Sequence, residues 1–127
     1  IVSKYNLVKK LQKIKSQNKS IYIYGASNRG NTILLYCGLN CSLISGAAER
    51  NPLKFGLETV GSRIPIVSEK LARDFNPDYF LILPYGFIGE FIKREYGYLK
   101  GGGRFLIPIP ELEEIYVSDD KILREKV

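Results

Sequence analysis

The sequence of 127 residues contains no histidine, no methionine and no tryptophan, and only two cysteines. Without histidine the chain lacks the commonest general base of enzymes. The cysteines, Cys37 and Cys41, offer at most two thiolate ligands, so a metal site is not expected. In a cytoplasmic protein both thiols would stay reduced, and we interpret Cys37 as a small core residue of a helix.

Long apolar runs are absent as well. No segment approaches the length of a membrane span, and Lys4, Lys9 and Lys10 are not followed by the apolar stretch of a secretory leader. We therefore expect a cytoplasmic protein without membrane contact. The length predicts a single domain over residues 1–127. The absence of methionine, with Ile1 at the start, favours a fragment of a longer enzyme, a processed chain, or one whose methionines were replaced or trimmed.

Acidic residues are missing from the first 48 positions, which carry seven basic residues, while the whole chain has a formal net charge of +6. Residues 1–19 are predicted to lead the chain as a basic amphipathic helix, because Leu7, Leu11 and Ile14 recur at helical spacing. Such a basic surface can bind nucleic acid. We favour a solvated face or docking onto an acidic neighbouring domain, because aromatic residues for base stacking are not interleaved.

Strands alternate with helices along the rest of the sequence. Apolar and β-branched runs predict strands at 21–24, 41–47, 63–67, 78–84 and 105–110. Helices are expected at 31–36, at 68–76, where Ser68 would be the N-cap, and at 87–96. Residues 111–117 are interpreted as a short extra strand, and residues 119–124 as a polar tail or short helix. Gly97 and the glycines at 101–103 are expected to stop the helix at 87–96 and turn the chain. The order predicts an α/β fold: a Rossmann-like three-layer sandwich with a mainly parallel sheet of about five strands.

A glycine loop between the first strand and the next helix is the strongest candidate site. A helix that starts directly after a strand directs free N–H groups at an anion. We interpret the loop as a phosphate pocket of a nucleotide ligand; a plain strand–turn–helix corner is the alternative. The loop lacks the lysine of a P-loop and the spacing of an NAD fingerprint. Its predicted substrate-binding residues are Gly25, Ser27, Arg29, Gly30, Asn31 and Thr32.

Residues after two later strands complete the predicted site, since ligands bind outside the carboxyl ends of parallel strands. Glu49 lies 24 residues after Gly25, where nucleotide-binding folds place a carboxylate on a ribose hydroxyl. Arg50 and Lys54 would reach a diphosphate, and Tyr85 would stack on a base or sugar. The alternative for each is an exposed loop residue with screened charge or a rim aromatic.

Several segments, in order along nearly the whole chain, resemble the C-terminal domain of bacterial SAM-dependent C-methyltransferases that act on nucleotide-linked deoxysugars. They are GASNRGNTILLYCG (25–38), NPLKFG (51–56), RIPIVSEK (63–70), NPDYFLILPYGF (76–87) and GGGRFLIPIPELE (101–113). The resemblance implies a longer parent enzyme with an N-terminal zinc-binding module and a central domain that binds S-adenosyl-L-methionine.

The resemblance further implies a division of labour. The parent enzyme would deprotonate a carbon next to a ketone, and the carbanion would attack the methyl group of S-adenosyl-L-methionine. This chain would hold the nucleotide-linked sugar, with no catalytic residue, metal or cofactor of its own, and would be inactive alone. Two alternatives stay open: a stand-alone nucleotide- or CoA-binding regulatory module, and a structural interaction domain that supports domain packing or a homo-oligomer.

Overall fold

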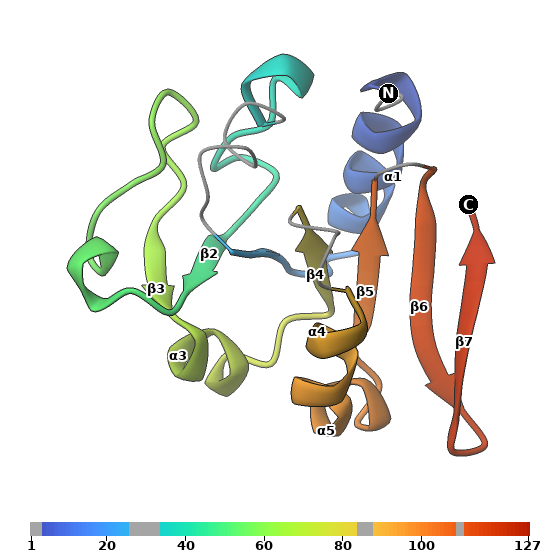
Figure 1. Ribbon diagram of the computed structural model, residues 1–127. Helices are drawn as coiled ribbons and strands as arrows, with labels where there is room; N and C mark the ends of the chain where they lie inside the picture. The colour runs from blue at the N-terminus through green and yellow to red at the C-terminus, as the bar shows by residue number, and fades with distance from the viewer. Residues whose placement is uncertain (1–3, 26–33, 84–87, 109–110) are drawn as a thin grey trace.

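A single seven-stranded sheet organises the computed structural model, which describes residues 4–25, 34–83, 88–108 and 111–127 (Figure 1). The strand order is β3-β2-β1-β4-β5-β6-β7. The first five strands are parallel, and β6 and β7 extend the sheet in antiparallel pairing. The strands are β1 (Ile21–Tyr24), β2 (Gly46–Glu49), β3 (Ile66–Ser68), β4 (Tyr79–Ile82), β5 (Arg104–Ile107), β6 (Glu113–Ser118) and β7 (Lys121–Lys126).

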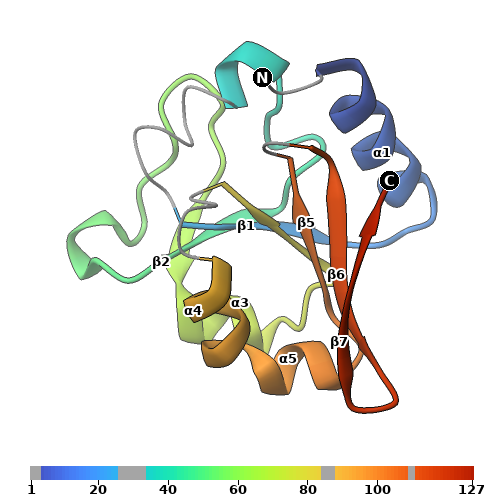
Figure 2. The same ribbon diagram turned by 45° about the vertical axis from the view of Figure 1, so that its right-hand side comes forward.

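Helices cover both faces of this sheet, which gives three layers (Figures 1 and 2). One face is covered by α1 (Lys4–Ser16) and by the helical residues 34–37. The other face is covered by α3 (Glu69–Asp74), α4 (Ile88–Arg94) and α5 (Tyr96–Lys100). A short 3-10 helix, η1 (Pro52–Lys54), follows β2.

The residues of β1 show how one sequence serves both layers. Ile21 and Ile23 belong to the core under α1, whereas Tyr22 and Tyr24 belong to the core under α3, α4 and α5. All four side chains are buried. Because successive side chains of a strand point to opposite faces, a strand covered on both sides needs a continuous apolar run. The run of isoleucines and tyrosines meets that need.

The expected α/β class with a mainly parallel sheet is confirmed, but the strand count of about five was wrong, since the sheet has seven strands. The helix predicted within residues 1–19 and the strand predicted at 21–24 are confirmed, as α1 and β1. Ser68 caps α3 as expected, because its hydroxyl accepts the Leu71 N–H at 3.0 Å.

The strand expected at 41–47 was placed too early. Residues 41–43 form a turn in which the side chain of Asn40 accepts the Ser42 N–H at 2.9 Å, and β2 begins only at Gly46. At Gly46 the ring of Tyr22 lies 2.6 Å from the point where a Cβ would stand. The neighbouring strand therefore packs its tyrosine over a position that only glycine fits.

Two C-terminal expectations were also wrong. Residues 119–124 are neither a tail nor a helix, because Asp119 and Asp120 both have positive φ and turn the chain into the β6–β7 hairpin. Positive φ at both loop residues is what a tight hairpin of matching twist requires. Gly97 does not stop a helix either, since it lies inside α5, whereas the predicted stop at residues 101–103 is confirmed by Gly101, which caps the end of α5.

Candidate functional site

A pocket of about 280 Å³ opens at the carboxyl ends of β1 and β2. The strand order reverses at β1, because β2 and β3 lie on one side of it and β4 and β5 on the other. Open α/β sheets bind ligands at such a reversal. The described residues that line the pocket are Tyr24, Gly25, Glu49, Arg50, Glu69, Glu90, Phe91 and Arg94.

Gly25 ends β1 in a conformation suited to glycine. Its φ is 90°, and its N–H donates to the Ala48 carbonyl of β2 at 2.8 Å. The backbone therefore leaves the sheet at the pocket while it stays bonded to the neighbouring strand. Of the predicted glycine loop, Ser27, Arg29, Gly30, Asn31 and Thr32 lie outside the described residues, as does Tyr85, and their ligand contacts stay predictions.

Glu49, Arg50 and Lys54 lie in and after the end of β2, and of the three only Glu49 and Arg50 are among the described residues that line this pocket; their ligand contacts stay predictions. Oε1 of Glu49 accepts the backbone N–H groups of Arg50 and Asn51 at 2.9 and 3.3 Å, and Oε2 lies 3.5 Å from the Lys54 ammonium group. Glu49 therefore orders the loop after β2 and offsets the charge of Lys54. Arg50 is exposed, and no ion pair holds its guanidinium among the residues that the structure describes.

The helical side of the pocket holds an ion cluster that the sequence did not predict. Nε of Arg94 donates to the Tyr24 hydroxyl at 2.9 Å, and that hydroxyl donates to Oε2 of Glu95 at 2.8 Å. Arg73 of α3 donates to the same Oε2 at 2.7 Å. Glu69 stands between the two arginines, 3.7 Å from Arg73 and 3.6 Å from Arg94.

Burial sets the electrostatics of this cluster. Glu95 is 1% exposed, and its Oε1 has no hydrogen-bond partner among the described residues. Burial, followed by the hydrogen bond to Glu95, raises the pKa of Tyr24 far above its usual value. Burial works to lower the pKa of Arg94, but the Tyr24 hydroxyl and the carboxylates of Glu69 and Glu95 raise it overall. The cluster is therefore a fixed set of charges beside the pocket.

Spacing along two helices was the signal that could have revealed the missed residues. Glu69 is the first residue of α3, directly after β3, and so lies at the edge of the sheet where ligands bind. Glu90 and Arg94 are four positions apart in α4 and so share a helix face. No sequence pattern indicates that Arg94 contacts Tyr24, because the two residues are 70 positions apart.

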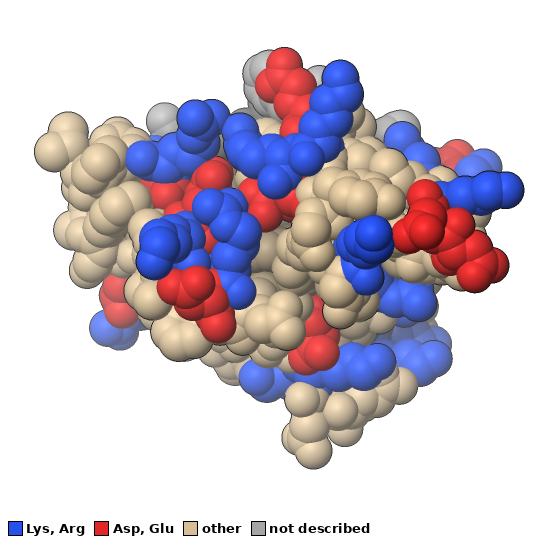
Figure 3. Space-filling view, turned by 90° about the horizontal axis from the view of Figure 1, so that it is seen from below, with Lys and Arg blue, Asp and Glu red and all other residues tan. Residues whose placement is uncertain are grey.

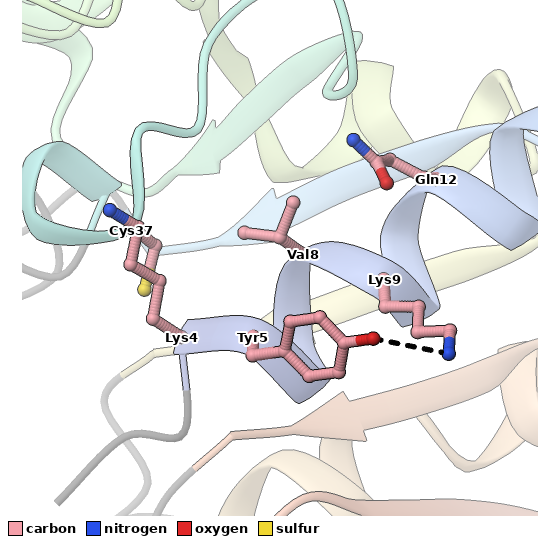
Figure 4. A pocket seen from close by; sticks show the side chains of 6 residues that line it. All are labelled: Lys4, Tyr5, Val8, Lys9, Gln12 and Cys37. Atoms are coloured by element: carbon pink, nitrogen blue, oxygen red, sulfur yellow. Dashed lines mark hydrogen bonds between the residues drawn. The ribbon is translucent and has the colours of Figure 1, made fainter.

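A second, larger pocket of about 610 Å³ lies on the other helical layer, beside α1 (Figure 4). It is lined by Lys4, Tyr5, Val8, Lys9, Gln12 and Cys37. The Lys9 ammonium group donates to the Tyr5 hydroxyl at 3.4 Å, as the close-up shows. Cys37 is buried, as predicted, and burial raises its pKa despite the nearby Lys4. This pocket holds no residue that the sequence predicted for ligand binding.

Basic and acidic side chains are intermixed over the surface formed by α3, α4 and α5 (Figure 3).

Within the described ranges, no three histidine, cysteine or acidic residues lie close enough together to hold a metal ion. Every helix in those ranges is also too short or too polar to cross a bilayer.

Comparison of the sequence with known proteins identifies a family profile and a relative that match it. Residues 2–110 match the profile described as the C-methyltransferase C-terminal domain. Over 96 residues, or 76% of the chain, the sequence is 40% identical to C-methyltransferase NovU of Streptomyces niveus. The chain spans only 23% of the length of that relative. The profile match ends before β6 and β7 begin.

Proposed function

The chain belongs to the family of C-methyltransferase C-terminal domains, and from that premise we propose that it binds and positions the sugar substrate of a SAM-dependent C-methyltransferase. The substrate class we propose is a nucleotide-linked deoxysugar. The chain contributes by holding that substrate in place, which lowers the barrier by orienting the reacting carbon toward the methyl donor.

One observation carries this proposal. Gly25, Glu49 and Arg50 were predicted as ligand contacts from their places after two different strands, and all three line one pocket. That pocket lies where the strand order reverses, at the edge of the sheet that binds ligands in open α/β folds. The larger pocket beside α1 has neither property.

The chemistry of the pocket suits a ligand with both phosphate and hydroxyl groups. The exposed guanidinium of Arg50 matches phosphate oxygens with its planar fork of donors. Carboxylates at the rim, Glu49 and Glu90, accept hydrogen bonds from ribose or sugar hydroxyls. The ring of Phe91 gives the wall an apolar face. Ser27, Arg29, Asn31, Thr32 and Tyr85 remain proposed contacts on the same edge.

Catalysis itself is assigned to other parts of the parent enzyme. The chain has no histidine that could serve as the base, and no residue here is proposed to bind S-adenosyl-L-methionine. That cofactor supplies the methyl group in the parent enzyme. More than three quarters of NovU lies outside the matched region, so a related parent has room for a SAM-binding and a zinc-binding domain. We therefore expect the chain alone to be inactive.

Calorimetric titration tests the proposal. The chain is titrated with dTDP, a dTDP-linked sugar, S-adenosyl-L-methionine and CoA, and the titrations are repeated with Arg29→Ala and Arg50→Ala. Arg124→Ala, at the distant β7 where Arg124 pairs with Glu113, is the matched control. Binding of the dTDP ligands, weakened by about 1.5–3 kcal/mol in the two test variants and unchanged in the control, supports the proposal.

The other outcomes separate the alternatives. Binding of S-adenosyl-L-methionine by this chain would contradict the division of labour. Selective binding of CoA would favour a regulatory module. If the chain binds none of the four ligands, the same titration on the longer parent enzyme distinguishes a site completed by other domains from a purely structural domain.

A further inference from the structure

Arg94 is held in the pocket wall by contacts that fix its orientation. It extends from α4, and its Nε donates to the buried Tyr24 hydroxyl at 2.9 Å. Its guanidinium carbon lies 5.2 Å from the centre of the Phe91 ring and 5.5 Å from that of Tyr24. A guanidinium held over two aromatic rings and by one hydrogen bond has little rotational freedom left to lose when a ligand binds.

Arg94 is ion-paired with two carboxylates, but it makes no hydrogen bond to either of them. The nearest carboxylate oxygens, from Glu69 and Glu95, stand at 3.6 and 3.9 Å, which is beyond hydrogen-bond distance. Oε2 of Glu95 is instead taken by Arg73 at 2.7 Å. The hydrogen bond that Arg94 makes within the described ranges is from Nε to a neutral hydroxyl, so its Nη groups can still donate hydrogen bonds at the pocket while one of them is ion-paired with Glu69.

The second arginine of the pocket comes from a different element. Arg50 follows β2, is exposed, and makes no ion pair within the described part of the chain. Two of the lining carboxylates are engaged, Glu49 by two backbone N–H groups and Lys54, and Glu69 by Arg73 and Arg94. Glu90, exposed and one helical turn before Arg94, suits a hydroxyl group next to the anion.

We propose that Arg94 binds the anionic part of the ligand, and that Arg94 and Arg50 together hold the diphosphate of a nucleoside diphosphate from two sides of the pocket. This inference rests on the proposed function and adds a specificity-determining residue to it. Tyr24 and Glu95 act as positioning residues: Tyr24 orients Nε of Arg94, and Glu95 orients the Tyr24 hydroxyl.

The test uses inorganic pyrophosphate as the probe, together with thymidine, dTMP, dTDP and a dTDP-linked sugar, titrated into the isotope-labelled chain by NMR. The decisive variant is Arg94→Lys, which keeps the charge but loses the planar fork. Arg124→Lys is the matched control. Tyr24→Phe keeps the ring of the positioning residue and removes the hydroxyl that holds Arg94. Backbone spectra without ligand establish that each variant is folded.

Four results are expected. Pyrophosphate shifts the Nε–Hε signal of Arg94 in the unaltered chain. Arg94→Lys weakens pyrophosphate and dTDP about tenfold or more, as expected for lost hydrogen bonds to a charged group, whereas Arg124→Lys has no effect. The weakening grows from dTMP to dTDP and is absent for thymidine. Tyr24→Phe weakens binding less than Arg94→Lys does, and its effect also grows from dTMP to dTDP. If Arg94→Lys does not fold, the Arg94 signal shift and the Tyr24→Phe series still decide the question.

Other outcomes would contradict either this inference or the proposed function, and they show which of the two fails. Undiminished dTDP binding by Arg94→Lys would overturn it, while the proposed function would stand. A variant that melts at lower temperature yet binds pyrophosphate equally would show Arg94 to be structural. No pyrophosphate binding by the unaltered chain would also overturn it, because both arginines are present. Arginine-dependent pyrophosphate binding without any gain for the dTDP-linked sugar would contradict only the proposed function.

Discussion

The hydroxyl of Tyr24 donates a hydrogen bond of 2.8 Å to Oε2 of Glu95, which joins β1 to the end of α4 across 71 positions of sequence. Both side chains are 1% exposed. Arg73 of α3 donates to the same carboxylate oxygen at 2.7 Å. One buried carboxylate therefore connects the strand that ends at the pocket with the two helices beside it, and the pocket depends on this connection for its shape.

Removing the Tyr24 hydroxyl or the Glu95 carboxylate is expected to destabilise the fold in graded steps. Tyr24→Phe lowers the free energy of unfolding by about 1–2 kcal/mol, because it deletes the hydrogen bond that the hydroxyl donates to Glu95 and the one that it accepts from Arg94. Glu95→Ala lowers it by about 2–3 kcal/mol, because it leaves the buried Tyr24 hydroxyl without its acceptor and the partly exposed Arg73 without its closest partner. Urea denaturation measures both. Tyr116→Phe is the matched control, since it removes a tyrosine–glutamate hydrogen bond that is exposed. Equal losses in Tyr24→Phe and Tyr116→Phe would contradict the account.

Two glycine substitutions should act in opposite directions. At Gly103 a Cβ would stand 2.2–2.4 Å from ring atoms of Tyr98, whose hydroxyl donates to the Pro77 carbonyl at 2.8 Å. Gly103→Ala is expected to lower stability by about 1–3 kcal/mol, because the held ring must move. Gly97, inside α5, has open space around the added carbon, and Gly97→Ala is expected to raise stability by up to about 1 kcal/mol. Thermal denaturation compares them, and a stabilising Gly103→Ala would show that the ring is not held.

Glu114 is expected to make the fold sensitive to acid. It lies 2.7 Å from the Lys10 ammonium group and 2.9 Å from Nη1 of Arg104. Burial works to raise its pKa, but the hydrogen bonds and charges of Lys10 and Arg104 lower the pKa overall from its ordinary value of 4.5. The unfolded chain therefore binds a proton more readily, so the stabilisation is full above that ordinary value and is lost as pH falls through the folded pKa.

Glu114→Gln isolates this contribution. Urea denaturation should find the variant less stable than the unaltered chain at pH 7, with a difference that shrinks below about pH 4. Glu125→Gln, at the exposed β7, serves as the control. A difference for Glu114→Gln that stays constant between pH 7 and pH 3 would mean that the carboxylate is not stabilised by its basic neighbours.

The two cysteines should react at very different rates. Cys41 is exposed, whereas Cys37 is 3% exposed and its pKa is raised by burial. Because the thiolate is the reactive form, iodoacetamide at pH 8 should modify Cys41 first and Cys37 only after unfolding. Mass spectrometry of the native chain and of Cys41→Ser gives the two rates. Fast labelling of Cys37 in native Cys41→Ser would contradict its burial.

Local sequence patterns predicted the elements whose boundaries and buried faces depend on residues close together in the sequence. The spacing of Leu7, Leu11 and Ile14 predicted α1, and all three are buried. The hydroxyl of Ser68 predicted the start of α3. Glu49 and Arg50 were predicted as ligand contacts for a topological reason, since parallel strands bring their carboxyl ends to one edge. The pocket brings both residues together beside Gly25.

Contacts distant in sequence were not predictable in the same way. The side chains of β7 are exposed on both faces, so no apolar alternation indicates a strand, and its pairing depends on the backbone of Asp119 and Asp120. Arg94 looked like an ordinary solvent-facing residue of α4. Its role as a pocket residue arises only when β1 brings Tyr24 beneath it. These contacts depend on packing between segments distant in sequence, which neither composition nor periodicity indicates.

The central claim is that the pocket at the ends of β1 and β2 receives the nucleotide-linked sugar, and NMR mapping of a dTDP-linked sugar on the isotope-labelled chain tests it most directly. The account predicts that the amide signals of Gly25, Glu49 and Arg50 shift on titration, while those of Tyr5 and Gln12 beside α1 stay in place. Shifts confined to the α1 pocket, with none at the ends of β1 and β2, would contradict it.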